Sequence, residues 1–320
     1  MINGKIYRSP LFYVGDKYKI LPEIKKYFPT KINRFIEPFT GGGSVFLNIQ
    51  ANEYLLNDID KNVINLHKFL LHQSRNPELF FQKLQEKIEK YGFSHSYKRD
   101  IVPPDLKRKF KKTYYAKFNK EAYQKLKTDF NKSEKKDLLD LYLLLIYGFN
   151  RILRFNSKGE FNLPVGNVDF NNNVFNALQT YFFLVKRKKI KLFNLDFAEF
   201  LFRIEIKKDD FVYLDPPYLI TFSEYNKLWN KEKEIQLLKI LDEMDKNGVK
   251  FAISNVTHYK GKVNEIFLNW SEKYNSYHIK SNYISYHDNS IKNFNEVLVT
   301  NYVVKIYRQK ELFDNMEIKK

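Results

Sequence analysis

Residues 34–44 read RFIEPFTGGGS, and this stretch decides the fold. The apolar run from Arg34 to Pro38 predicts a strand, Ser44 to Gln50 predicts a helix, and the three glycines between them let the backbone approach a ligand. The alternation repeats with a strand over Glu53 to Asn57 and a helix over Asp60 to His72. This order predicts an α/β domain with its ligand at the carboxyl edge of the sheet.

Strand signals stop between Pro77 and Tyr147, where lysine-rich helical stretches take over. Two examples are Glu121 to Asn131 and the apolar run Leu138 to Ile146. Residues 153–164 then form two short segments around a Ser-Lys-Gly turn, which predicts a β-hairpin. We therefore expect a helical module with a hairpin, inserted into the α/β domain.

Alternation resumes in the C-terminal half of the chain. The expected strands are Lys189 to Asn194, Phe211 to Leu214, Val249 to Ser254 and Glu296 to Val304, with a helix over Lys231 to Asp245. The last residues, 309–320, are expected to form a frayed charged tail.

Composition excludes several classes of protein. The 320 residues are 43% hydrophobic, with a mean hydropathy of −0.52, and they contain no transmembrane run and no apolar signal-peptide core, so we expect a cytoplasmic chain. The absence of cysteine excludes disulfides, thiolate zinc sites and thiol nucleophiles. Zinc base deaminases and cytosine C5 methyltransferases, which need cysteine, are excluded with them.

The net charge of +18 suits a polyanionic partner. Lysine-rich composition is also typical of AT-rich genomes, so the total alone does not decide the partner. Its distribution is more informative, because Lys98 to Lys136 holds 14 basic and 5 acidic residues. We interpret this segment as a candidate contact surface for a polyanionic partner such as nucleic acid. The six histidines have no metal-ligand spacing, and no metal site is expected.

Asp58 ends the second predicted strand, in the position to accept hydrogen bonds from a ribose diol. The third glycine of a dinucleotide fingerprint is absent, since Phe46 stands there. The pattern therefore favours a nucleoside ligand. The structural alternative is an ordinary tight turn with a capping aspartate.

The sharpest motif is Asp215-Pro216-Pro217-Tyr218, directly after the apolar strand Phe211 to Leu214. Two prolines stiffen the loop and remove two amide donors, which leaves carbonyls and a carboxylate as acceptors. Such a loop suits an exocyclic amine. The Asp215 side chain and the Pro216 carbonyl can each accept a hydrogen bond from one N–H group of that amine. Tyr218 offers a ring on which a flipped base can stack.

The sequence resembles the Dam-type DNA adenine N6-methyltransferases along nearly its whole length. The matching blocks are YVGDKY (13–18), EPFTGGGSVFLN (37–48), NDID (57–60), GEFNLPVG (159–166), DPPY (215–218) and EVLVTNY (296–302). The resemblance implies a Rossmann-like class I S-adenosylmethionine-dependent fold with a mixed seven-stranded sheet. It also implies a catalytic domain over residues 1–72 and 170–308, interrupted by a target recognition domain over residues 73–169.

The resemblance further implies site residues. Those for S-adenosylmethionine are Tyr13, Lys17, Pro38, Phe39, Gly41, Gly43, Asp58, Asp196, Phe197 and Asp215, and the catalytic residues are Asp215, Pro216, Pro217 and Tyr218. Those for DNA are Phe149, which would wedge into the duplex, and Asn150, Ile152, Arg154, Asn162 and Pro164. Arginine reading of guanine and an aromatic wedge are consistent with this assignment.

Two residues depart from the family pattern. The family's Gly-Gly-Lys is Gly15-Asp16-Lys17 here, and Phe12 replaces a lysine that helps to read the first guanine of GATC. GATC is still the favoured target, with methyl transfer to adenine N6 in duplex DNA. A separate restriction endonuclease partner and a monomeric enzyme are expected. The alternatives are a cytosine-N4 methyltransferase and a catalytically silent DNA-binding protein of the same fold.

Overall fold

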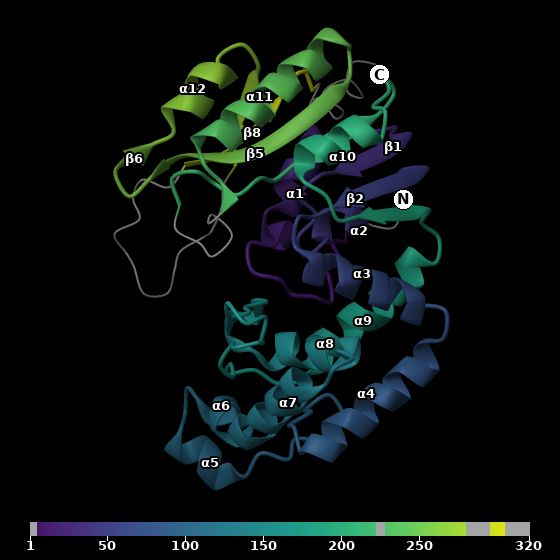
Figure 1. Ribbon diagram of the computed structural model, residues 1–320, viewed down its shortest axis with the longest axis vertical. Helices are drawn as coiled ribbons and strands as arrows, with labels where there is room; N and C mark the ends of the chain where they lie inside the picture. The colour runs from purple at the N-terminus through teal and green to yellow at the C-terminus, as the bar shows by residue number, and fades with distance from the viewer. Residues whose placement is uncertain (1–4, 222–227, 280–294, 305–320) are drawn as a thin grey trace, which may run out of the picture. The chain divides into compact units, whose positions relative to one another are not determined.

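The computed structural model describes residues 5–221, 228–279 and 295–304 (Figure 1). The chain divides into two compact units. The first unit contains residues 1–18 and 39–200, and the second contains residues 19–38 and 201–320.

In the first unit, two parallel strands carry the loops that matter most for function. They are β2 (Glu53–Asn57) and β3 (Ile190–Phe193), in register from Tyr54 opposite Ile190 to Asn57 opposite Phe193. Three helices of this unit are α2 (Ser44–Asn48), α3 (Lys61–Gln73) and α9 (Asn172–Val185). The expected bounds of β2, α2, α3 and β3 are confirmed to within two residues, whereas α9 was not predicted.

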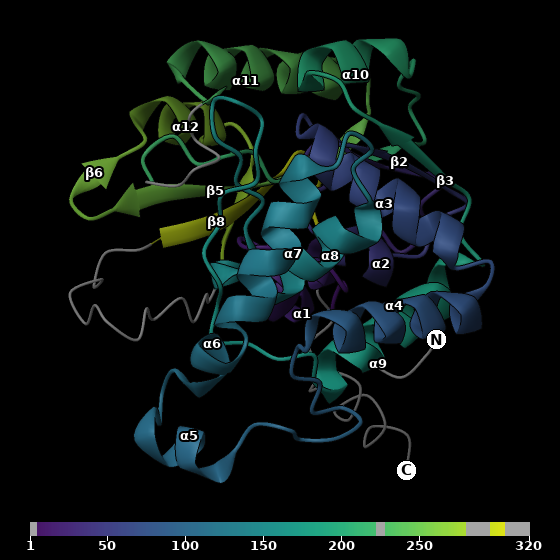
Figure 2. The same ribbon diagram turned by 60° about the horizontal axis from the view of Figure 1, so that its bottom comes forward.

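The predicted change from strands to helices between residues 77 and 147 is confirmed. Its helices are α4 (Pro77–Tyr91), α5 (Pro104–Lys109), α6 (Tyr114–Phe118), α7 (Lys120–Lys132) and α8 (Leu138–Tyr147). Figures 1 and 2 show α7 beside α8, and α7 buries Tyr123, Leu126 and Phe130. Lys120, Lys125 and Lys132 of the same helix are exposed. Helix α8 is buried along nearly its whole length, as its apolar sequence predicts.

The predicted β-hairpin forms only in part. Residues 153–164 contain one isolated antiparallel bridge, between Phe155 and Phe161, instead of two strands. The ladder bonds beside this bridge run from the Asn156 N–H to the Glu160 carbonyl at 2.9 Å and from the Asn162 N–H to the Arg154 carbonyl at 3.0 Å. The ladder ends there because the Asn162 carbonyl accepts from the Arg154 side chain at 2.8 Å.

The second unit contains a mixed set of strands in the order β1 (Arg34–Glu37), β4 (Phe211–Leu214), β5 (Lys250–Tyr259), β8 (Asn295–Thr300) and β7 (Asn275–His278). Strand β4 is parallel to β1 and β5, whereas β8 is antiparallel to β5 and β7. Helices α11 (Lys231–Lys246) and α12 (Glu265–Ser271) cover β5 (Figure 1). All four residues of β4 are buried, so this strand is the core of the unit.

The predicted α/β class with a mixed sheet is confirmed. Among the described residues, seven strands have four or more residues, and β6 (Lys262–Val263) is an additional short one on β5. The shorter helices are α1 (Leu21–Ile24) and α10 (Phe197–Arg203), and the 3-10 helices are η1 (Lys17–Lys19), η2 (Lys25–Tyr27) and η3 (Phe149–Arg151). No helix within the described ranges is both long and apolar enough to cross a membrane.

Candidate functional site

The glycine turn has a left-handed backbone that favours glycine. Gly43 caps α2 in the left-handed region, with φ of 78°. A Cβ atom on Gly43 would lie 2.4 Å from the Phe46 ring and 2.8 Å from the His67 ring, so a side chain there forces both rings to move. Gly41 is also left-handed, with φ of 48°. The turn is therefore built for close packing, as its sequence predicts.

The glycine turn is hydrogen-bonded to the end of β2. The Thr40 N–H donates to the Asn57 carbonyl at 2.9 Å, and the Gly41 N–H donates to Asp58 Oδ2 at 2.8 Å. Asp58 Oδ1 accepts from the Asp60 N–H at 2.9 Å. Each carboxylate oxygen keeps a second lone pair, so Asp58 can still accept from a ligand hydroxyl.

Burial raises the pKa of the Asp58 carboxyl to about 6. The two backbone N–H donors act in the opposite direction and hold the ionised form. At neutral pH the carboxylate is therefore charged, and it is oriented by the chain itself.

Two asparagines join the end of β2 to the end of β3, and the sequence reading missed both. Asn57 exchanges two hydrogen bonds of 3.0 Å with the backbone of Leu195. Asn194 donates to the carbonyls of Asp58 at 2.8 Å and Ile59 at 3.0 Å. An amide side chain at the end of each of two neighbouring strands was the available signal. We call residues 39–43, 57–60 and 194–197 the glycine cradle.

An aromatic pair and a capping carboxylate complete the cradle. The rings of Phe39 and Phe197 lie 5.5 Å apart, inclined at 34°. Asp196 accepts from the Ala198 N–H at 2.9 Å and so caps the start of α10. Apolar rings beside an oriented carboxylate are the surroundings that a nucleoside needs, because its base is flat and its sugar carries hydroxyls.

The N-terminal segment is fastened to helix α2. Ser44 accepts from the Ser9 N–H at 3.0 Å and donates to Asp16 at 2.7 Å, while Asn48 exchanges two bonds of 2.7 Å with Tyr7. Burial raises the pKa of the Asp16 carboxyl. The family departure at Asp16 thus has a structural role, as an anchor on the first residue of α2.

This anchoring places Tyr13 against the glycine turn. The Tyr13 Cβ atom lies 3.0 Å from where a side chain on Gly42 would begin, and its ring packs near Gly41. Tyr13 and Lys17 are both buried. Of the predicted cofactor residues, the first unit thus brings Tyr13 to the turn formed by Gly41 and Gly43.

The His67 side chain is hydrogen-bonded to the glycine turn. Its Nε2 lies 2.8 Å from the Gly41 carbonyl, so Nε2 carries the proton and donates. Burial lowers the pKa of the imidazole to about 4, which keeps it neutral at physiological pH. His67 is 1% exposed and packs within the turn. The described residues contain no cluster of three metal-ligating side chains.

The second unit holds the Asp-Pro-Pro-Tyr loop directly after β4. The Tyr218 hydroxyl lies 3.0 Å from Asp215 Oδ1 and 3.2 Å from Glu296 Oε1, at the start of β8. Asp215 is half-buried, whereas Glu296 is 1% exposed. Glu296 was not predicted as a site residue, although its place in the EVLVTNY block was noted. Pro38, the remaining predicted cofactor residue, follows directly after β1 and is buried.

The predicted DNA-contacting residues all lie in one segment of the first unit. We call residues 148–166 the recognition strip. Phe149 is 52% exposed, and Asn150 has left-handed φ of 53°. Asn162 and Pro164 are exposed and Ile152 is half-buried.

Arg154 is held within the recognition strip by Asn162. Its Nε donates to Asn162 Oδ1 at 2.9 Å and its Nη2 donates to the Asn162 carbonyl at 2.8 Å. Three of its five N–H donors stay outside these two bonds. Arginine in this position is oriented by its neighbour and can still present an edge to another molecule.

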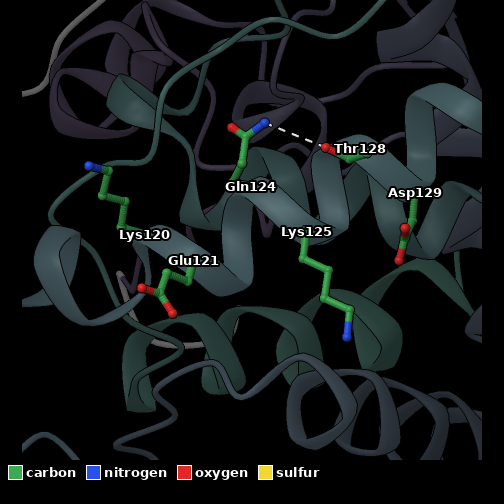
Figure 3. Close-up of a pocket in the computed structure, with 6 residues that line it drawn as sticks. All are labelled: Lys120, Glu121, Gln124, Lys125, Thr128 and Asp129. Atoms are coloured by element: carbon green, nitrogen blue, oxygen red, sulfur yellow. Dashed lines mark hydrogen bonds between the residues drawn. The ribbon is translucent and has the colours of Figure 1, made fainter.

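A polar hollow of about 520 Å³ lies on helix α7 in the lysine-rich insertion (Figure 3). It is lined by Lys120, Glu121, Gln124, Lys125, Thr128 and Asp129. The side chains mix both signs of charge, and Gln124 bonds Thr128 within the same helix. The hollow therefore has none of the convergent groups of the glycine cradle.

A mixed α/β chain with a glycine turn, a strand-end Asp58 and an Asp-Pro-Pro-Tyr loop has the features of an amino-group DNA methyltransferase. The chain belongs to the family of D12 class N6 adenine-specific DNA methyltransferases, whose profile matches residues 13–285. A methyltransferase family implies a methyl donor.

Curated relatives cover nearly all of this chain. A type II methyltransferase, M.FokI of Planomicrobium okeanokoites, is 35% identical over 304 residues, which are 92% of this chain and 43% of the relative. The modification methylase StsI of Streptococcus sanguinis is 33% identical over 95% of this chain and 44% of its own length. A DNA adenine methylase of Salmonella typhi is 28% identical over 78% of this chain and 80% of its own length. The chain thus spans less than half the length of the first two relatives.

Proposed function

We propose that this chain transfers a methyl group from S-adenosylmethionine to N6 of adenine in a short duplex DNA site, with GATC as the favoured site. The observation that carries the proposal is the Asp-Pro-Pro-Tyr loop, whose carboxylate and carbonyls offer only acceptors to an NH2 group. The family membership and the relatives named as adenine and modification methylases support adenine as the target. A modification role beside a separate restriction endonuclease belongs to the same proposal.

The glycine cradle is the proposed site for the donor. S-adenosylmethionine supplies an electrophilic methyl group on a sulfonium. Asp58 would accept from the ribose hydroxyls, Phe39 and Phe197 would contact the adenine, and the turn at Gly41 and Gly43 would lie along the ligand. Tyr13, Lys17, Pro38 and Asp196 complete the proposed set.

Asp215 is the proposed acceptor for the adenine amino group. In the transfer, N6 would bond to the methyl carbon as the carbon–sulfur bond breaks, with that electron pair staying on sulfur, and the charged nitrogen would pass its proton to Asp215 or to water. Asp215 and the Pro216 carbonyl would hold both N–H groups and favour a tetrahedral nitrogen, while Pro217 stiffens the loop. Tyr218 would stack on the flipped base.

Glu296 is a proposed positioning residue for Tyr218. The tyrosine hydroxyl has one proton, yet it lies within hydrogen-bond distance of two carboxyl groups. Glu296 would hold the tyrosine hydroxyl beside Asp215 and so orient the Tyr218 ring.

The recognition domain is proposed to be residues 73–169. Phe149 would fill the gap left by the flipped base, and Asn150, Ile152, Arg154, Asn162 and Pro164 would contact bases or backbone. The basic segment from Lys98 to Lys136 would add phosphate contacts.

The test is turnover by purified Asp215→Ala protein with labelled donor and duplex DNA. We expect loss of methyl transfer with DNA binding largely retained, since Asp215 is proposed to contact the target amine and the donor and no phosphate. The matched control is Asp209→Ala, in the exposed turn just before β4. An Asp215→Ala protein with undiminished turnover contradicts the proposal.

A further inference from the structure

Two arginine side chains of the first unit lie over one aromatic ring. The guanidinium carbon of Arg8 is 4.5 Å from the centroid of the Phe12 ring, and that of Arg151 is 4.3 Å from the same centroid. Each contact is a favourable cation–π interaction. Sharing one ring also brings two positive charges close to each other, which is unfavourable without an anion.

Neither arginine forms an ion pair within the described part of the chain. Arg8 Nε is buried and has no hydrogen-bond partner there, and Arg151 Nε has only a long bond of 3.4 Å to the Ile146 carbonyl. Asp16 acts on Arg8 electrostatically but forms no hydrogen bond to it in the described part of the chain, and its oxygens accept from Ser44 and Tyr18. Most of the N–H donors of this pair thus face no acceptor of the chain.

The backbone around the pair is strained. Phe12, Asn150 and Arg151 all have left-handed φ, of 49°, 53° and 51°. Non-glycine residues rarely adopt this conformation, and such strain gathers where a site is held ready for a ligand. Here the strain holds the Arg151 side chain over the Phe12 ring.

We propose that Arg8 and Arg151 form a clamp for one phosphodiester group of the DNA backbone. The proposal rests on the proposed function, because it takes duplex DNA as the ligand. A phosphate anion cancels the repulsion between the two guanidinium groups and accepts their free donors in pairs. A neutral base edge does not cancel that repulsion, and this difference favours the backbone over a base.

Two further observations agree with the clamp. Burial, together with the charge of Arg8, lowers the pKa of Arg151 to about 10, as expected for a cation that lacks a counter-ion. Arg151 also follows directly after the exposed Phe149 and Asn150 of the recognition strip. A phosphate held there would fix the register of the duplex on the strip.

The test measures binding of the full chain to a fluorescent duplex by anisotropy, at several salt concentrations and with several duplex sequences. The variants are Arg8→Gln and Arg151→Gln. The matched control is Arg187→Gln, because Arg187 also lies over one phenylalanine, 4.4 Å from the Phe183 centroid, but has no second arginine beside it. Thermal melting checks that each variant is folded.

Each clamp variant is expected to weaken binding about five- to tenfold on every sequence and to lower the salt slope by about one. The double variant is expected to lose less than the product of the two, since both groups bind one phosphate. Arg8→Lys and Arg151→Lys keep the charge and are expected to keep the slope.

Variants that bind like Arg187→Gln would overturn the clamp. So would a loss confined to one sequence with an unchanged slope, which indicates a base contact. Methylation of the same duplexes is assayed in parallel, so failure of the proposed activity is recognised separately: a chain that binds duplex with the expected slopes but never methylates it leaves the clamp standing.

Discussion

The glycine cradle and the recognition strip differ in whether their polar groups form hydrogen bonds within the chain. In the cradle, the Thr40 and Gly41 N–H groups and the asparagines at the ends of β2 and β3 all bond within the chain. In the strip, Phe149 is exposed, Asn150 is strained and Arg151 has no ion-pair partner among the described residues. The difference indicates that the polar groups of the cradle are satisfied within the chain, whereas the strip keeps groups that the proposed DNA partner could contact.

The largest expected effect on stability comes from a substitution in the glycine cradle. Gly43→Ala adds a Cβ atom at 2.4 Å from Phe46 on a left-handed backbone, which we expect to cost roughly 3 kcal/mol of unfolding free energy. Binding of S-adenosylmethionine should fall with it. Urea unfolding and calorimetry measure the two effects.

The matched substitution in the strip is Gly159→Ala. Gly159 is equally left-handed, with φ of 76°, but a Cβ atom there meets nothing within 4 Å. Backbone strain alone is expected, at about 1 kcal/mol. Equal losses for the two variants would mean that the cradle is not the more tightly built region.

Arg154→Ala tests the strip with a smaller effect. We expect a loss of about 1 to 3 kcal/mol in discrimination between sites, as for a bidentate base contact, with unfolding free energy and donor binding nearly unchanged. Methylation of a library of duplex sites measures the preference. An unchanged site preference would contradict the proposal that Arg154 contacts a base.

The smallest effect is a pH dependence of donor binding. Since burial raises the pKa of Asp58 to about 6, its carboxylate is protonated below that pH and loses capacity to accept from ribose. Affinity should fall up to about tenfold for each pH unit below 6 and stay flat above it. His67, with its pKa lowered to about 4, stays neutral over this range.

Asp58→Asn is the control for that dependence. The amide has no charge to lose, so its donor affinity should be lower than that of the parent protein at pH 7 and nearly constant down to pH 5. A parent protein whose affinity does not change between pH 7 and pH 5 would contradict the role of Asp58.

Sequence reasoning was most successful where one apolar run or one special backbone angle decides the structure. The four-residue β4 and the apolar α8 are found where their sequences predict them, and Gly43 needs glycine for its packing. It failed where distant side chains decide. The hairpin ladder ends where the Arg154 side chain takes the Asn162 carbonyl, and neither Asn194 nor Glu296 carries a local signal of its partner.

The two residues that differ from the family pattern, Asp16 and Phe12, have structural roles that could not be predicted from the sequence. Asp16 bonds the first residue of α2, and Phe12 carries two arginines from segments far apart in the chain. Both roles depend on contacts between distant segments, so neither position could be interpreted from its neighbours.

The central claim is that the loop at Asp215 directs methyl transfer to the amino group of adenine. Its most direct test is incubation of purified protein with duplex DNA and donor carrying a tritiated methyl group, followed by digestion to nucleosides and chromatography. The account predicts that the label elutes as N6-methyldeoxyadenosine and is absent with Asp215→Ala. Label in N4-methyldeoxycytidine, or no label on DNA of any sequence, would contradict it.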